Sequence, residues 1–288
     1  AGEVTNVLYV ARDINDQKIS ELESREELRR TAQEAEKANL AKTDFLRRMS
    51  HDVRTPINGI QGCVDIADRY PDNLELQKEA RTKIRTASGY LLNLVNDVLD
   101  MNKLESGNIQ LERKHFNLLE ILHNTNEITR MQANEAGVNY YVEDGEIIHT
   151  QLTGSPVHFQ QILMNIGSNA VKYNHDGGSV TVTCREVSYT DTTAEYELTC
   201  TDTGIGMSEE FQKRAFEPFA QEGQSARTKY AGTGLGLAIA RKLTELQGGT
   251  LFFESIQGKG TKFILHISFE ISAEEQEKKS HTYQNCSV

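Results

Sequence analysis

The sequence of 288 residues has little proline, little cysteine, a deficit of positive charge and no long apolar run. Only four residues are proline, while 38% are hydrophobic and 25% are charged, which excludes collagen-like, mucin-like and largely disordered proteins. No apolar run approaches the roughly 20 residues that a membrane-spanning helix needs. Because 42 acidic residues oppose 31 basic ones, with a formal net charge of −11, we expect no nucleic-acid partner.

The cysteines and the first residue bear on where the chain belongs. Cys63, Cys184, Cys200 and Cys286 form no CxxC pair and no zinc-ligand spacing, so we expect reduced thiols and a cytoplasmic location. Residue 1 is alanine and no signal peptide is visible, so we expect a fragment of a longer protein. Whether a membrane segment precedes it or a further domain follows it is left open. The length predicts two modules.

The first part of the chain has a helical pattern. Residues 1–18 include one alternating β-branched segment, which predicts a strand that completes an upstream domain. Residues 19–44 predict a signalling coiled-coil helix with a narrow apolar seam. Residues 45–112 predict a hairpin of two long helices, broken at residues 70–73. The hairpin has one apolar face, which two helices alone cannot bury, so we expect dimerisation into a four-helix bundle. The alternative is a plain coiled-coil spacer.

Residues 113–271 change to short strands, glycine clusters and helices, which predicts an α/β sandwich. Residues 272–288 are polar and charged, and we expect a flexible tail. The expected strands are Val138–Val142, Val180–Val187, Ala194–Thr201, Thr250–Glu254 and Thr261–Phe269. The expected helices are Leu118–Ala133, Val157–Lys172 and Leu235–Leu246.

Three segments of this second module suit a nucleotide. Asn165, Asn169 and Lys172 share one helix face, where amide oxygens suit Mg²⁺ and an ammonium suits phosphate. Asp202-Thr-Gly204-Ile-Gly206 follows a strand, and its carboxylate can accept a hydrogen bond from an amine such as that of adenine. Gly232-Thr-Gly234-Leu-Gly236 opens a helix, where backbone can approach phosphates. Each segment alone also fits a solvated helix face or a tight turn.

Taken in order, these segments resemble the N, first glycine and second glycine boxes of sensor histidine kinases, with Phe216-Glu-Pro218-Phe219 as the F box between the glycine boxes. The resemblance implies a Bergerat ATP-binding fold with ATP and Mg²⁺ as cofactors. It implies that Asn169 binds Mg²⁺ with Asn165 beside it, that Asp202 contacts adenine, and that Arg227 and Lys229 are available for the γ-phosphate. The further nucleotide contacts that it implies are Lys172, Tyr173, Gly204, Gly206, Phe219, Gly232, Thr233, Gly234, Leu235, Gly236 and Thr261.

A phosphoacceptor motif lies in the first helix of the hairpin. Ser50-His51-Asp52-Val53-Arg54-Thr55-Pro56 resembles the H box of the largest histidine kinase class. Histidine offers a neutral nitrogen nucleophile near pH 7, and an adjacent carboxylate can hold the proton of its other nitrogen. The resemblance implies His51 as phosphoacceptor, Asp52 as base and Thr55 as a position used for phosphatase activity. Val7–Lys18 resembles the end of a PAS sensor domain.

The sequence therefore predicts a dimeric sensor histidine kinase core that phosphorylates His51 and passes the group to a response-regulator receiver domain, separate or fused. An upstream sensor domain is the expected input. One alternative is a Bergerat-type ATPase that forms no phosphohistidine. The other is a non-catalytic dimeric signalling scaffold.

Overall fold

The computed structural model describes residues 18, 24–33, 36, 47, 49–50, 52–222 and 233–272. The chain divides into two compact units, residues 1–91 and 92–288, and each is described by itself. Three expected segments lie mostly or wholly outside the described residues. These are the strand within residues 1–18, much of the helix at 19–44 and nearly all of the tail at 272–288. Within the described ranges, no helix is both long and apolar enough to cross a membrane.

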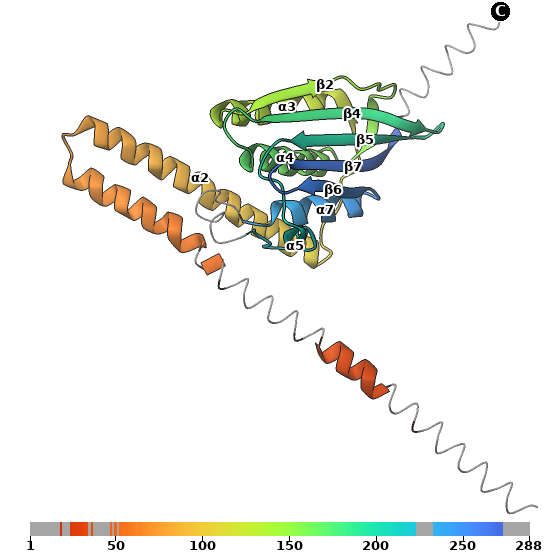
Figure 1. The fold of residues 1–288 in the computed structure, drawn as a ribbon, viewed down its shortest axis with the longest axis horizontal. Coiled ribbons are helices and arrows are strands. Elements are labelled where there is room, and N and C mark those ends of the chain that lie inside the picture. Colours follow the sequence, from red (N-terminus) through yellow and green to blue (C-terminus); the bar gives the residue numbers. More distant parts are fainter. Residues whose placement is uncertain are drawn as a thin grey trace, which may run out of the picture. The chain divides into compact units, whose positions relative to one another are not determined.

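An antiparallel pair of helices forms the hairpin (Figure 1). Residues 52–69 are the first helix, and α2 (Leu74–Glu105) is the second. The turn is closed by the Gln77 side chain, whose Nε2 donates to the carbonyl oxygens of Ala67 at 2.6 Å and Tyr70 at 3.1 Å. These bonds occupy carbonyls that the end of the first helix would otherwise leave without a partner. The expected hairpin is confirmed.

Much of the apolar stripe of the hairpin is exposed in the single chain. Ile57 is 38% exposed, Leu92 is 62% exposed, Val95 is 42% exposed and Leu99 is 50% exposed. Scattered exposed leucines are normal, but a stripe at helical spacing is typical of a helix–helix interface.

One seven-stranded sheet forms the centre of the second unit (Figure 1). The strand order is β1-β3-β7-β5-β4-β2, and β6 pairs with the first half of β7, on the edge whose far end pairs with β3. The pairing is antiparallel except between β2 and β4, which run parallel. The strands are β1 (Lys114–Asn117), β2 (Asn139–Glu143), β3 (Gln151–Gly154), β4 (Ser179–Tyr189), β5 (Thr193–Asp202), β6 (Thr250–Ile256) and β7 (Gly260–Ile271).

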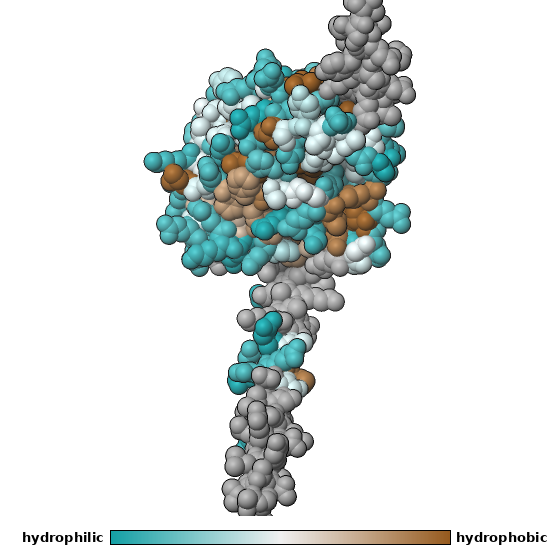
Figure 2. Space-filling model, turned by 90° about the vertical axis from the view of Figure 1, so that its right-hand side faces the viewer, coloured by the Kyte–Doolittle hydropathy of each residue, from teal (hydrophilic) through white to brown (hydrophobic). Residues whose placement is uncertain are grey.

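Three helices cover one face of this sheet, as Figure 1 shows: α3 (Leu118–Glu135), α4 (Pro156–Lys172) and α7 (Gly236–Leu246). A short helix, α5 (Glu209–Gln212), precedes the F box. Between the two layers, the Phe159 ring meets the edge of the Phe269 ring at 5.1 Å between centroids. On the face shown in Figure 2, hydrophobic residues form only small patches within a hydrophilic surface.

The α/β sandwich expected from the sequence is confirmed, and every expected strand and helix of the second module has a counterpart. Two strands were not predicted, β1 and β3. Each has four residues, which is too short to show an alternating pattern. They pair with one another, and β3 also pairs with the end of β7.

Candidate nucleotide site

The polar face of α4 carries the first part of the site. Asn165 and Asn169 lie on this face, opposite the buried Phe159 and Ile162 that anchor the helix to the core. The side-chain nitrogen of Asn165 is buried and has no hydrogen-bond partner in the described protein. A buried amide donor without a partner costs about 1–3 kcal/mol, so this atom is suited to a partner from outside the protein.

Lys172 ends the same helix. Its Nζ lies 4.8 Å from the centroid of the Tyr173 ring, a cation–π arrangement. Burial lowers the pKa of Lys172 to about 8, and the carboxylate of Asp97 acts in the opposite direction. The ammonium is therefore mostly charged at pH 7 and incompletely hydrated, which favours an anion beside it.

Asp202 forms the second part of the site, at the end of the central strand β5. Its Oδ1 accepts hydrogen bonds from the backbone nitrogen of Gly204 at 2.8 Å and from that of Thr261 at 3.2 Å. Burial raises the pKa of Asp202 to about 6, although both backbone bonds lower it. With Oδ1 held by the backbone, Oδ2 is the oxygen suited to accept a hydrogen bond from a ligand.

The glycines after Asp202 are required by close backbone approaches. A Cβ on Gly204 would lie 2.3 Å from the carbonyl oxygen of Tyr173, so only glycine lets this turn pack on the end of α4. Gly206 has a φ of +61°, and a Cβ there would lie 2.1 Å from the carbonyl oxygen of Ile256. The first glycine box is thus tied to both the N box and the turn before β7.

The second glycine box faces the amides of α4. Gly236 is the first residue of α7, and a Cβ on it would lie 3.4 Å from Oδ1 of Asn165 and 3.8 Å from Nδ2 of Asn169. Segments about seventy residues apart in sequence therefore meet at one point, where the N-terminus of α7 favours negative charge. Gly234, with a φ of +70°, accepts a hydrogen bond at its carbonyl oxygen from the backbone nitrogen of Phe219 at 2.9 Å.

The structure brings together most of the residues that the sequence singles out in the second unit. Four of the predicted residues, His51, Arg227, Lys229 and Gly232, lie outside the described residues. Asp52 and Thr55 lie on the helix at residues 52–69, where Asp52 is half-buried and Thr55 is exposed.

Sequence reasoning missed a contact that α2 makes with the site. Thr233 donates from Oγ1 to Oδ2 of Asp97 at 2.8 Å, and Gln161 donates from Nε2 to Oδ2 of Asp100 at 2.8 Å. Asp97 and Asp100 are spaced three apart on one face of α2, which is the only signal that the sequence offers for them. We call this pair of bonds the α2 contact.

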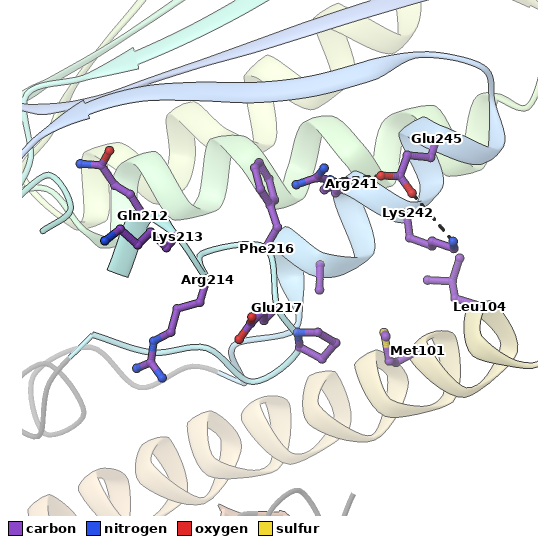
Figure 3. A pocket seen from close by; sticks show the side chains of 12 residues that line it. Met101, Leu104, Gln212, Lys213, Arg214, Phe216, Glu217, Arg241, Lys242 and Glu245 are labelled. Atoms are coloured by element: carbon purple, nitrogen blue, oxygen red, sulfur yellow. Dashed lines mark hydrogen bonds and ion pairs between the residues drawn. The ribbon is translucent and has the colours of Figure 1, made fainter. Parts of the chain in front are cut away.

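A hollow of about 450 Å³ lies between the end of α2 and the segment around the F box (Figure 3). Met101 and Leu104 of α2 lie on one side, and the F-box residues Phe216 and Pro218 lie on the other. Across the hollow, Glu245 on α7 pairs with Arg241 at 3.1 Å and with Lys242 at 3.8 Å, the dashed lines in Figure 3.

Two family models match this chain. Residues 154–271 match the model described as histidine kinase-, DNA gyrase B- and HSP90-like ATPase. Residues 41–107 match the His Kinase A (phospho-acceptor) domain. The matched segments follow one another in the order expected from the motifs.

Curated relatives and solved structures agree with these matches. The sensory/regulatory protein RpfC of Xanthomonas campestris is 34% identical over 84% of this chain and 33% of its own length. The autoinducer 2 sensor kinase/phosphatase LuxQ of Vibrio cholerae is 32% identical over 94% of this chain and 31% of its own. The chain thus spans about a third of the length of these relatives.

Among solved structures, full-length ShkA in complex with AMPPNP is 27% identical, has a TM-score of 0.57, and is matched over 79% of this chain and 46% of that one. The histidine kinase ThkA in complex with the response regulator TrrA has a TM-score of 0.59 at 22% identity, over 80% of this chain and 62% of that one. This second likeness shows the shared fold.

The fold and the site define the second unit as an ATP-binding module of the histidine kinase, gyrase B and HSP90-like type. With the phosphoacceptor domain before this module, the chain belongs to the sensor histidine kinases.

Proposed function

We propose that this chain is the catalytic core of a sensor histidine kinase, which binds Mg²⁺-ATP in the second unit and transfers the γ-phosphoryl group to His51. The observation that carries the proposal is the meeting of Asn165, Asn169 and Gly236 at the N-terminus of α7. Asp202, a buried carboxylate with one oxygen held by backbone, supports the same reading.

Asp202 is the proposed adenine contact. At pH 7 its carboxyl is ionised, because its pKa of about 6 lies below that pH. The ionised Oδ2 accepts a hydrogen bond from the exocyclic amine of the base. Gly204 and Gly206 let the turn after Asp202 pack closely on the backbone of Tyr173 and Ile256, which keeps the carboxylate in place.

The phosphates lie at the other end of the proposed site. Asn169, with Asn165 beside it, supplies neutral amide oxygens, and these together with phosphate oxygens form a donor set that suits Mg²⁺. Within the described ranges no group of three or more His, Cys, Asp or Glu residues is arranged to hold a metal ion, so Mg²⁺ would depend on the nucleotide for its remaining ligands. When bound, Mg²⁺ neutralises phosphate charge.

Positive groups hold the phosphates in place for transfer. Lys172 and the N-terminus of α7 are the described ones, and Arg227 and Lys229 are the further cations proposed for the γ-phosphate. The ring nitrogen of His51 attacks the γ-phosphorus, the bond from that phosphorus to the bridging oxygen breaks, and ADP leaves. Asp52 holds the proton of the other ring nitrogen and stabilises the charge that forms on the ring.

The partners follow from the same reading. We infer that the exposed stripe of Ile57, Leu92, Val95 and Leu99 is buried in a homodimeric four-helix bundle. The phosphoryl group then passes from His51 to a receiver-domain aspartate, and ThkA is a structural neighbour solved with a response regulator. Thr55, one helical turn after His51, is proposed to orient water for removal of phosphate from that aspartate.

Incubation with ATP labelled on the γ-phosphate tests the proposal. A phosphohistidine gives label on the protein that is lost in acid and kept in base. Release of labelled phosphate with no labelled protein would favour the Bergerat-type ATPase instead. No binding of nucleotide and no label would favour the signalling scaffold.

A further inference from the structure

The C-terminal part of α2 belongs to the same compact unit as the nucleotide site, and it places a carboxylate beside the residues proposed to bind phosphate. Asp97 accepts the hydrogen bond from Oγ1 of Thr233, in the second glycine box, at 2.8 Å. The same Thr233 oxygen accepts a hydrogen bond from the backbone nitrogen of Leu235 at 3.2 Å, at the start of α7. Asp97 is therefore linked through one hydroxyl to the backbone that opens the phosphate-binding helix.

The charges around Asp97 show that its carboxylate lies in the field of the phosphate site. Burial raises its pKa, the bond from Thr233 lowers it, the neighbouring Asp100 raises it, and Lys172 lowers it. In turn, Asp97 raises the pKa of Lys172 against the larger effect of burial. Asp97 is thus the counter-charge of a lysine that the proposed function gives to the nucleotide.

A bound polyphosphate would change this arrangement. Its negative charge would compete with Asp97 for Lys172 and Thr233, and two anions close together in a partly buried site repel strongly. The nucleotide can therefore bind fully only if the carboxylate moves away or is neutralised. The cost of that change reduces the observed affinity.

A shift of the Asp97 side chain is enough for this change. Leu104, near the end of α2, is 4% exposed and belongs to the hydrophobic core, and Val98 and Met101 pack against that core. Met101 and Leu104 also line the hollow of about 450 Å³ (Figure 3). The backbone of α2 therefore stays in place, while the carboxylate of Asp97 can turn to another rotamer.

We propose that Asp97 is a nucleotide-displaced latch: its carboxylate holds the second glycine box through Thr233, and the phosphates of the bound nucleotide displace it. Asp97 is a positioning residue that sets the affinity for phosphates through Thr233 and Lys172. The inference rests on the proposed nucleotide site and names a regulation of that site.

Calorimetry on the full chain tests the latch, with Mg²⁺-ADP and adenosine as probes. Asp97→Asn keeps the shape of the side chain and removes its charge, so Mg²⁺-ADP should bind about tenfold more tightly. Adenosine, which has no phosphate, should bind with unchanged affinity. Asp100→Asn is the matched control, because it removes the same charge one turn along α2, and its Mg²⁺-ADP affinity should change less than twofold.

Each other outcome is decisive. Equal Mg²⁺-ADP affinities of wild type and Asp97→Asn, an equal gain for adenosine, or an equal gain in Asp100→Asn would each overturn the latch. If the wild type binds neither probe, the proposed nucleotide site itself is wrong, which distinguishes the two failures.

Discussion

Replacing Asp202 by asparagine should make the protein more stable and, at the same time, unable to bind adenine well. The side chain sits at the end of β5 with 6% of its surface exposed, and burial raises its pKa from the ordinary 3.8 to about 6. Because the pKa of Asp202 is higher in the folded protein than in the unfolded one, the folded protein binds one more proton at pH values between the two. Its stability therefore falls as pH rises from about 4 to about 6.

The size of the effect follows from the two pKa values. The gap between 3.8 and about 6 corresponds to about 3 kcal/mol at pH 7. Asparagine keeps an oxygen for the backbone nitrogens of Gly204 and Thr261, but the bonds to a neutral amide are weaker. We therefore expect a net gain of about 1–2 kcal/mol in the free energy of unfolding at pH 7.

The loss of binding should be larger. The exocyclic amine of adenine loses a charge-assisted hydrogen bond of about 1.5–3 kcal/mol, so the Kd for ADP should rise about 10- to 150-fold. In the wild type, binding that needs the ionised carboxylate should weaken about tenfold between pH 7 and pH 5, and this dependence should vanish in Asp202→Asn.

Urea unfolding at pH 7 and pH 4, together with ADP titration by calorimetry, measures both effects. Asp191→Asn, an exposed carboxylate in the β4–β5 turn, is the control and should change neither. Lower stability of Asp202→Asn at pH 7 would refute the reasoning about burial. Unchanged ADP affinity would refute the assignment of the pocket.

Three further changes test other parts of the account. Asn169→Ala should weaken ATP far more than adenosine in calorimetry, because it removes the proposed Mg²⁺ ligand and not the purine contact; equal losses would contradict that role. Leu92→Glu should destabilise the dimer by several kcal/mol, since it buries an unpaired charge, whereas Lys78→Glu on the exposed side of α2 should not; light scattering that finds wild type monomeric at micromolar concentration would refute the bundle. Thr55→Ala should keep autophosphorylation and slow dephosphorylation of the regulator; a parallel fall of both would mean that Thr55 only shapes the helix.

The sequence predicts well those features that are local or that recur as ordered motifs. The helices and the longer strands follow from periodicity, and the glycine boxes mark the loops that meet around α4. Gly204 and Gly206 show why: each occurs where a backbone from another segment leaves no room for a Cβ. The motif therefore encodes a contact as well as a turn.

The α2 contact is the part that the sequence could not predict. Asp97 and Thr233 lie 136 residues apart, and Asp97 stands within an amphipathic helix where a carboxylate usually faces water. Nothing in the periodicity distinguishes a solvated aspartate from one that docks on a glycine box. The short strands β1 and β3 were missed for a simpler reason, because four residues cannot establish a period.

The most direct test of the central claim compares the wild type with His51→Gln. Both are incubated with ATP labelled on the γ-phosphate, and the affinity for nucleotide is measured in the same preparations. The account predicts an acid-labile label on the wild type and none on the variant, while both bind Mg²⁺-ADP equally well. Undiminished label in His51→Gln would contradict the assignment of the phosphoacceptor and with it the proposed function.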